Sequence, residues 1–422
     1  MPLLDDHSRP YQYIAIRTDI SIQKGVERAL SDARQRELDT GLTIQQSLLL
    51  GDSPRVAQLE IATFTQPSQG VDGDFYEFFA HGNICDVLIG DVMGKGVNAA
   101  LMGAGIKSHY GRALSSILAD SMSSDEFPLP HAIINRLHQQ LTTELIGLGA
   151  FVTIAYCRIN LRSGSLAYIG GGHPPAILIT GSGESSLLSG SNIPIGISQD
   201  ENYTETGHPF NSGDLLFMYS DGVTEARNGA GEEFGVERLI SELAKLRMIG
   251  VPPALLVQCV RRAVLQFTGN PEWSDDFTTI AIWRNGARRD FNYEEFARDL
   301  NELRRLREWV GTCCATFLPD DCKQRLIFAA VEIASNIIRH ADVPVRGAAF
   351  LCHYEVSPTE VRLDFYYLGT PYDRSKVAPP DFSGATEGGF GLYIIEQSVD
   401  KFSQREIADQ VNLLTLTMSR NV

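Results

Sequence analysis

The 422-residue chain lacks the cysteine patterns that build zinc sites or disulfide scaffolds. It contains no C-x-x-C pair, and no cysteine has a histidine partner at metal-ligand spacing. We therefore expect its seven cysteines to be small buried residues in a reducing compartment. They are Cys85, Cys157, Cys259, Cys313, Cys314, Cys322 and Cys352.

Long apolar runs and positive charge are also scarce. No window approaches the roughly 18 apolar residues of a membrane span, and the amino terminus has no basic segment followed by an apolar stretch. We therefore expect a cytoplasmic protein that does not bind membranes. The 36 Lys and Arg against 52 Asp and Glu give a net charge of −16, which argues against nucleic-acid binding. The acidic excess suits a cation-binding protein, although a solvated acidic surface gives the same number.

The length predicts more than one domain. We expect an N-terminal segment and helical connector over residues 1–51, because residues 18–50 contain no proline and space their apolar side chains as a helix does. A larger domain is expected over 52–285, and a smaller one over 290–422, after a polar, turn-rich linker.

The predicted elements indicate an α+β fold. Residues 57–284 read as hairpins and buried strands interrupted by two long helices, near 97–119 and 131–146, which predicts a layered sandwich rather than a doubly wound sheet. In the smaller domain the pattern predicts helices over 291–317, 322–341 and 391–400, with strands over 348–356, 360–368 and 412–419.

Aspartates recur in the larger domain at strand ends or in glycine turns. They are Asp72 and Asp74 in VDGDFYEFF, Asp91 in IGDVMGKG, Asp221 in YSDGVTEARN, and Asp275 and Asp276 in WSDDFTTIAI. Each alone is also typical of a turn. If they converge, their mutual repulsion requires bound cations, and a site built of oxygen ligands selects Mg²⁺ or Mn²⁺. Two such ions imply phosphoester hydrolysis by an activated water, without a covalent Ser or Cys intermediate.

The order of these four motifs, with GGHPP at 171–175 between the second and third, resembles the PPM family of metal-dependent Ser/Thr phosphatases, in its bacterial branch of sporulation and stress-response regulators. The resemblance covers about residues 40–284 and implies an α/β/β/α sandwich. It also implies a two-metal site made by Asp74, Asp91, the Val92 carbonyl, Asp221 and Asp275.

Within that set the resemblance makes Asp91 the bridging ligand and favours Asp275 over Asp276. The family branch has glycine where this chain has Asp72, which we interpret as a turn residue. We interpret His173 in GGHPP, Ser220 and Lys95 as structural or turn residues before catalytic ones. The helical connector, in this branch, transmits a signal to the phosphatase or forms a homodimer.

The smaller domain carries a second pattern. Glu332, Asn336, Arg339 and His340 share one helical face, and Gly388, Gly389 and Gly391 stand directly before a helix, where backbone N–H groups can hold phosphates. Together they resemble the GHKL ATPase fold of anti-sigma-factor serine kinases, an α/β sandwich. The resemblance makes Asn336 the Mg²⁺ ligand of ATP, Glu332 the general base, and the glycines part of the nucleotide lid.

One motif of that family is altered. Its adenine-binding Asp-x-Gly-x-Pro aligns with Tyr367-Leu-Gly369-Thr-Pro371, so Tyr367 stands where a carboxylate accepts the adenine amino group, and Asp364 is three residues too early. We therefore weigh two roles for this domain: an ATP-dependent serine kinase, or a kinase-shaped module that binds the kinase's protein partner.

The resemblances together predict a partner-switching phosphatase whose substrate is a phosphorylated STAS-type (anti-anti-sigma-like) protein. The smaller domain would bind that protein or a sigma factor. The alternatives are a bifunctional switch with an active kinase and a mainly sequestering, anti-sigma-type regulator.

Overall fold

The structure is a computed structural model that describes residues 2–4, 10–13, 24, 48–68, 73–120, 127–270, 273–285, 293–341, 349–371 and 390–420. By its contacts the chain divides into two compact units, Met1–Leu48 and Leu49–Val422. In the first, β1 (Pro2–Leu4) pairs antiparallel with β2 (Pro10–Tyr13). Nearly all of the predicted helical connector lies outside the described residues. The predicted boundaries at 285 and 290 stay a prediction, because the second unit is not divided there.

Two five-stranded antiparallel sheets form the first part of the second unit. One has the order β10-β7-β6-β5-β4 and the other the order β3-β12-β11-β8-β9. Their strands are β3 (Leu59–Gln66), β4 (Phe75–His81), β5 (Ile84–Val92), β6 (Val152–Asn160), β7 (Ser165–Gly171), β8 (Ala176–Ile179), β9 (Ser185–Leu188), β10 (Thr206–Pro209), β11 (Leu215–Tyr219) and β12 (Phe277–Arg284).

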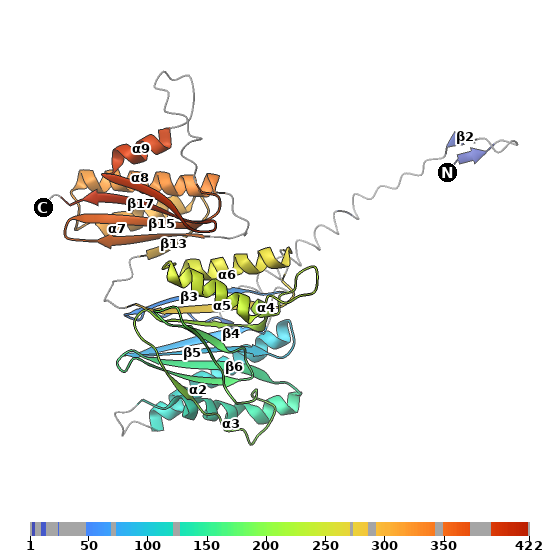
Figure 1. Ribbon diagram of the computed structural model, residues 1–422. Helices are drawn as coiled ribbons and strands as arrows, with labels where there is room; N and C mark the ends of the chain where they lie inside the picture. The colour runs from blue at the N-terminus through green and yellow to red at the C-terminus, as the bar shows by residue number, and fades with distance from the viewer. Residues whose placement is uncertain are drawn as a thin grey trace. The chain divides into compact units, whose positions relative to one another are not determined.

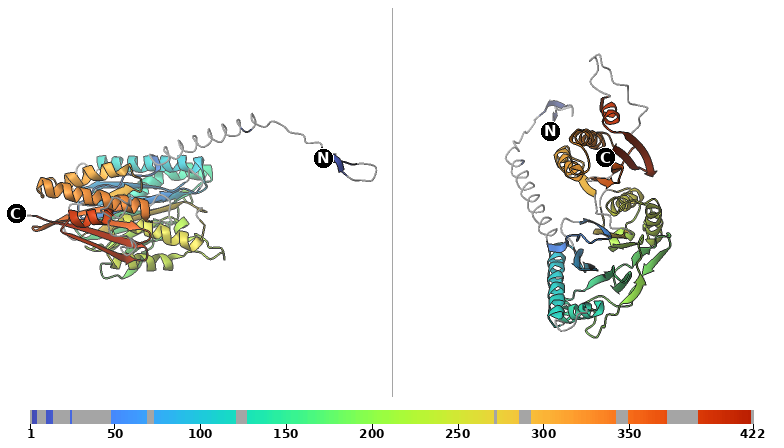
Figure 2. Two further views of the ribbon diagram at one scale, coloured as in Figure 1. Left: turned by 90° about the horizontal axis from the view of Figure 1, so that it is seen from above. Right: turned by 90° about the vertical axis from the view of Figure 1, so that its left-hand side faces the viewer.

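Helices cover the outer faces of both sheets. The first sheet contacts α2 (Val97–Asp120) and α3 (Pro130–Leu148), and the second contacts α5 (Val236–Met248) and α6 (Pro253–Thr268). A short helix, α4 (Asp221–Thr224), follows β11. The four layers, helix–sheet–sheet–helix, are visible in Figure 1 and from two further directions in Figure 2. The predicted α+β sandwich is therefore confirmed.

The sequence of β5 does not alternate between polar and apolar residues, because both faces of the strand are buried. Every residue from Cys85 to Gly90 is buried, because one face of β5 contributes to the core between the sheets and the other to the core under α2 and α3. The one charged residue in that stretch, Asp86, is fully buried and accepts two hydrogen bonds from Arg158, at 2.7 and 2.6 Å, and one from Tyr156 at 2.5 Å. This bidentate pair satisfies both buried charges.

The second part of the unit is a five-stranded antiparallel sheet covered by helices. The strand order is β13-β14-β15-β17-β16. The strands are β13 (Tyr293–Ala297), β14 (Ala349–Val356), β15 (Glu360–Leu368), β16 (Lys401–Ala408) and β17 (Val411–Ser419), and the helices are α7 (Glu302–Cys314), α8 (Asp320–His340) and α9 (Phe390–Ser398). Helices and sheet share a core that contains Phe350, Leu363 and Phe365. This is the predicted smaller α/β sandwich.

One predicted helix needs correction, and three elements were missed. The helix expected over 291–317 begins only at Glu302, because Tyr293–Ala297 forms edge strand β13, paired with β14 and with Phe296 in the core. Strand β16 was not predicted: it is an edge strand with largely polar, exposed side chains. Helices α5 and α6 were also missed; in α6 every residue from Pro253 to Arg262 is buried, including the polar Gln258, Arg261 and Arg262.

Helix α6 is buried on more than one side because it also contacts β14 and β15 of the third sheet. Arg262 donates a hydrogen bond to the Asp409 carbonyl at 2.8 Å, and one apolar cluster joins α6 side chains to Leu351, Leu368 and Val411. On the other side, Arg261 donates to the Gln66 side chain at 2.8 Å and lies over the ring of Phe64. The helix thus packs against both the second and the third five-stranded sheet.

Candidate active site

The first pair of predicted aspartates lies where β4 begins and β5 ends. Asp74 directly precedes β4, and Asp91 lies opposite Thr153 of β6 in the sheet register. Gly73 connects them: a Cβ atom at this position would lie 2.7 Å from the Val92 carbonyl oxygen and 3.2 Å from Oδ1 of Asp91. The close backbone approach therefore requires glycine. It also brings the predicted carbonyl ligand, Val92, beside both carboxylates.

The second group forms where β11 meets the start of β12. Asp221 begins α4, and a Cβ on Gly222 would overlap the carbonyl oxygen of Asp276, so this turn lies directly against the Asp275–Asp276 backbone. Ser220 fixes the junction: its hydroxyl donates to the Asp276 carbonyl and accepts from the Thr278 backbone N–H, both at 3.0 Å. Ser220 is fully buried, so the structure supports its interpretation as a strand-end residue.

The electrostatics tie the two groups together. The pKa of Asp74 is raised well above its ordinary value, first by burial and then by the charges of Asp91 and Asp276, while the hydroxyl groups of Thr278 and Ser220 oppose the rise. The pKa of Asp221 is raised by burial and by the charge of Asp275. The charges of Asp91 and Asp276 therefore lie near Asp74, and the charge of Asp275 lies near Asp221.

The two members of the Asp275–Asp276 pair have different surroundings. Asp275 is 47% exposed and its Oδ1 lies 3.0 Å from Nζ of Lys95, which also donates to the Ser274 carbonyl. Asp276 is only 6% exposed, accepts a hydrogen bond from the Ser68 backbone, and is the member whose charge reaches Asp74. Asp72 lies outside the described residues.

These residues fit a divalent cation. Oδ2 of Asp74 is buried and has no hydrogen-bond partner among the described residues, which leaves a carboxylate oxygen that a bound cation would satisfy. Within the described ranges no three carboxylate, imidazole or thiol groups already stand in the arrangement of a complete ion site. The donors are present as two adjoining groups, and the nearby Lys95 ammonium offsets part of the charge of the more exposed one.

His173 lies behind this site rather than in it. Its ring is 8% exposed, and Nδ1 lies 2.9 Å from the hydroxyl of Thr153, the residue opposite Asp91. Burial lowers the pKa of His173 to about 3, so the imidazole is neutral at physiological pH. A neutral, buried ring is a poor general acid, in agreement with its interpretation as a structural turn residue.

The sequence argument missed Glu225 and Thr153. Glu225 follows α4, and its pKa is raised by partial burial and by the charges of Asp221 and Glu233. Thr153 carries no motif, and only the strand register places it across from Asp91. Glu225 had a sequence signal, because it lies four residues after Asp221 in the same SDGVTEA segment.

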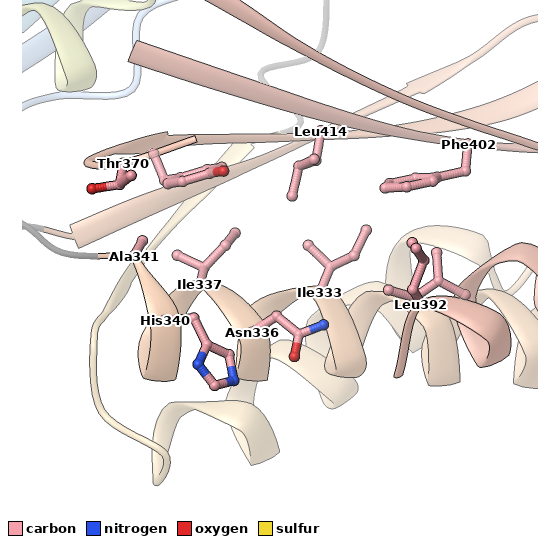
Figure 3. Close-up of a pocket in the computed structure, with 11 residues that line it drawn as sticks. Ile333, Asn336, Ile337, His340, Ala341, Thr370, Leu392, Phe402 and Leu414 are labelled. Carbon is pink, nitrogen blue, oxygen red and sulfur yellow. The ribbon is translucent and has the colours of Figure 1, made fainter. Parts of the chain in front are cut away.

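The smaller sandwich has a separate pocket between α8, α9 and its sheet (Figure 3). Asn336 and His340 of α8 line it, as do Tyr367 and Thr370 at the end of β15. Gly391 at the start of α9 lies so close to Glu332 that a Cβ there would overlap its carboxylate. Three predicted residues, Glu332, Asn336 and Gly391, are therefore neighbours, whereas Gly388 and Gly389 lie outside the described residues.

The altered adenine motif has a structural counterpart. The described lining of this pocket contains no carboxylate, and Tyr367 on its wall is 1% exposed. Asp364 cannot substitute, because residues three apart on a strand point to opposite faces of the sheet. Asp364 instead accepts hydrogen bonds from Arg362 and from Thr415, at 2.9 and 2.6 Å. Gly369 keeps a left-handed φ of 128° and its carbonyl accepts from Asn412.

The described part of the chain contains no helix that is both long and apolar enough to cross a bilayer. All seven cysteines are free; five of them are buried, as expected, whereas Cys313 and Cys322 are only partly buried.

Comparison with known proteins agrees with this geometry. Residues 82–285 match the family described as Stage II sporulation protein E (SpoIIE), and residues 296–418 match the histidine kinase-like ATPase domain. The chain is 28% identical over 271 residues to "Protein IcfG" of Synechocystis sp., a match that covers 59% of this chain and 42% of that one. It is 27% identical over 218 residues to "Phosphoserine phosphatase RsbU" of Bacillus subtilis, which covers 51% of this chain and 62% of the relative.

Among solved structures, the SiaA-PP2C domain of Pseudomonas aeruginosa superposes with a TM-score of 0.52 at 20% identity, over 61% of this chain and 99% of that one, which indicates a shared fold. The chain spans about half the length of the curated relatives that it matches. Two family matches therefore follow one another along this chain, a SpoIIE-type domain over residues 82–285 and a histidine kinase-like ATPase domain over residues 296–418.

Proposed function

We propose that the larger domain is a metal-dependent phosphatase that removes phosphate from serine or threonine of a protein. The observation that carries this proposal is the buried Oδ2 of Asp74, without a partner in the described chain and close to the charges of Asp91 and Asp276. The proposed ligands of two Mn²⁺ or Mg²⁺ ions are the side chains of Asp74, Asp91, Asp221 and Asp275 and the carbonyl of Val92. When bound, such ions lower the pKa of a shared water and offset charge on the phosphoryl group.

The chain's own residues give the site its form. Gly73 allows the Asp74 segment to approach the end of β5, and Gly222 allows the Asp221 segment to approach the Asp275–Asp276 backbone. Ser220 holds the end of β11 against the start of β12 through its two hydrogen bonds. Asp74 lies deepest, at 2% exposure, and Asp275 lies at the solvent side, where a protein-bound phosphate group enters.

For the substrate we propose a phosphorylated STAS-type protein in a partner-switching pathway. Support comes from the sequence similarity to a relative named phosphoserine phosphatase RsbU and from the second family match, to a histidine kinase-like ATPase domain. We propose that the smaller domain binds the same protein or a sigma factor. Two sites in one chain raise the effective concentration of a shared substrate at the phosphatase.

Release of p-nitrophenol from p-nitrophenyl phosphate tests the catalytic part. We expect Mn²⁺-dependent turnover by the wild type that Asp91→Asn abolishes and that EDTA removes. Asp200→Asn, which deletes an exposed turn carboxylate, is the matched control and should keep full activity. Wild-type protein that is inactive with both metals while it still captures a STAS protein or a sigma factor would favour the sequestering alternative.

One observation keeps the kinase alternative in view: Glu332, Asn336 and Gly391 lie together beside a small pocket of about 30 Å³. If this domain is an ATP-dependent kinase, titration with ATP and Mg²⁺ should saturate below millimolar concentration, and Asn336→Ala should abolish it. Absence of binding at millimolar ATP rules the kinase out and leaves the partner-binding role.

A further inference from the structure

Large apolar side chains are exposed at the end of the first sheet where β5 finishes and β6 begins. Met93 directly follows β5 and is 40% exposed, Leu148 is the last residue of α3 and is 63% exposed, and Ile197, in the loop between β9 and β10, is 52% exposed. Phe151, directly before β6, is partly exposed. We call these four residues the apolar rim. Single exposed apolar residues are ordinary, so what matters is whether the four adjoin.

A backbone hydrogen bond joins Met93 to Phe151. The Met93 N–H donates to the Phe151 carbonyl at 3.0 Å. Val92 and Val152 are partners in the register of β5 and β6, so this bond continues the pairing one step beyond the end of β5. The rim therefore begins at the residue next to Val92, whose carbonyl is a proposed metal ligand.

A close backbone contact brings the loop of Ile197 to the same place. Gly196, the preceding residue, has a positive φ of 100°, and a Cβ atom there would lie 2.6 Å from the Ala150 carbonyl oxygen and 3.1 Å from Cα of Phe151. Only glycine allows this approach. Leu148 lies two residues before Ala150 in the turn against which Gly196 packs. All four rim residues are thus within two residues of these two backbone contacts.

The loop that carries Ile197 is held in place although it has no regular secondary structure. Ile195 exchanges two backbone hydrogen bonds with Val152 of β6, at 2.9 and 3.0 Å. The side chain of Asn135 on α3 accepts from the Tyr203 N–H at 2.8 Å and donates to the Tyr203 carbonyl at 3.0 Å. The loop thus presents an apolar side chain to solvent in a fixed position, and a partner that binds it does not have to order it first.

The rim lies in uncharged sequence. Residues 92–94, 145–152 and 190–198 contain no Asp, Glu, Lys or Arg, although such residues make up 21% of this chain and give it a net charge of −16. A surface of this kind offers no charge for a partner to pair with. It is recognised by apolar side chains that bury it from water.

The position of the rim indicates which partner covers it. A second copy of the chain, or a segment of the same chain, seated there permanently would crowd the approach to Val92. A substrate protein arrives with its phosphate and leaves after hydrolysis, so it can cover the rim without closing the site. The phosphorylated residue has to reach the carboxylates beside Val92, and the protein surface around it then comes to lie against the neighbouring residues.

We propose that the apolar rim docks the phosphorylated protein substrate, through an apolar patch that this protein carries beside its phosphorylated serine or threonine. The inference rests on the proposed phosphatase function. Met93, Leu148, Phe151 and Ile197 then determine which phosphoproteins are hydrolysed, whereas the aspartates act on any phosphate ester that reaches them.

The test uses full-length protein with Mn²⁺ and two kinds of substrate: p-nitrophenyl phosphate, and the phosphoserine forms of the STAS-type proteins encoded in the same genome. Leu148→Ser and Ile197→Ser remove exposed apolar surface. We expect each to lower kcat/KM about 10-fold for the STAS protein that the wild type hydrolyses best, through a higher KM, and to leave kcat/KM for p-nitrophenyl phosphate unchanged. Leu148→Met and Ile197→Val, which keep an apolar side chain, should retain most of the activity on the protein.

Leu129→Ser is the matched control. Leu129 is 59% exposed and caps the other end of α3, about 28 Å from Leu148 by the rise of the helix, so both activities should stay unchanged. Thermal melting checks that the variants fold, and light scattering measures their oligomeric state.

Three results in folded variants overturn the docking proposal: unchanged kcat/KM for the protein in both serine variants, equal losses on the two substrates, or the same selective loss in Leu129→Ser. A change of oligomeric state in the serine variants also overturns it, because the rim would then be a contact between copies. Wild-type protein that hydrolyses p-nitrophenyl phosphate but no STAS phosphoprotein overturns it as well and leaves the phosphatase assignment intact. Wild-type protein inactive on both substrates overturns the phosphatase function itself.

Discussion

Acid should destabilise the larger domain through His173. The folded protein holds this ring buried and neutral with a pKa of about 3, whereas an unfolded chain gives histidine a pKa of about 6.5. As the pH falls below about 6.5, His173 binds a proton in the unfolded state but stays neutral in the folded state. The stability that the neutral ring contributes is therefore complete above about pH 6.5 and is lost progressively as the pH falls towards 3.

The size of the effect follows from the two pKa values. Each pH unit between them changes the free energy of unfolding by about 1.4 kcal/mol. From pH 7.5 to pH 5.0 only about 1.5 units lie below 6.5, so His173 should cost about 2 kcal/mol over that interval. His173→Gln cannot titrate. The stability difference between wild type and His173→Gln should therefore shrink by about 2 kcal/mol, while the contributions of all other groups cancel.

Urea unfolding in EDTA at the two pH values measures this difference. Of the three tryptophans, Trp273 and Trp283 lie in the larger sandwich and Trp309 lies on α7, so Trp309→Phe in both proteins makes fluorescence report on the larger domain alone. Parallel pH dependence of wild type and His173→Gln would refute the reasoning, because it would mean that the ring is already protonated or solvated when folded.

Three further predictions concern other parts of the chain. Saturating Mn²⁺ at about 100 times its Kd should raise the free energy of unfolding by about 2.7 kcal/mol, and Asp74→Asn should remove most of that gain in the same fluorescence assay. Asp86→Asn should cost about 3 kcal/mol in urea unfolding, because it leaves the buried Arg158 charge uncompensated; a loss below 1 kcal/mol would mean that water reaches the pair. Tyr367→Asp should restore or strengthen ATP binding by calorimetry, and no change would show that the tyrosine is not what limits it.

Periodicity predicted the elements that are half-buried. The helices near 97–119 and 131–146 each have a buried and an exposed side, and the hairpin of β6 and β7 has a turn signal at its centre, so all were found close to their observed bounds. Contrast between two sides was not sufficient, because α5 was missed despite its buried stripe of Leu239, Leu243 and Leu246, and α6 was missed as well. The FNYEEF segment was read as the start of a helix although it pairs with β14.

For the candidate site, motif order identified the aspartates but not their environments. Strand ends and glycine turns predicted that Asp74, Asp91 and Asp221 would meet. The close approach at Gly73 brings the Asp74 segment to Asp91, and that at Gly222 brings the Asp221 segment to the Asp275–Asp276 backbone, while their meeting in one metal site stays a prediction. Sequence spacing cannot tell which of two adjacent carboxylates points inward. The burial of Asp276 and the exposure of Asp275 depend on how the loop after α6 enters β12, which no local pattern encodes.

The double burial of α6 bears on how the chain can be cut. Arg262 and the apolar side chains that join Leu351, Leu368 and Val411 would face water in a fragment that ended near residue 285. Such a fragment would expose the apolar surface of α6, the helix that precedes Asp275 and Asp276 in the chain. The parts of the chain before and after residue 285 are therefore poorly suited to separate expression. A gene split at that junction should yield aggregates rather than a soluble, active enzyme.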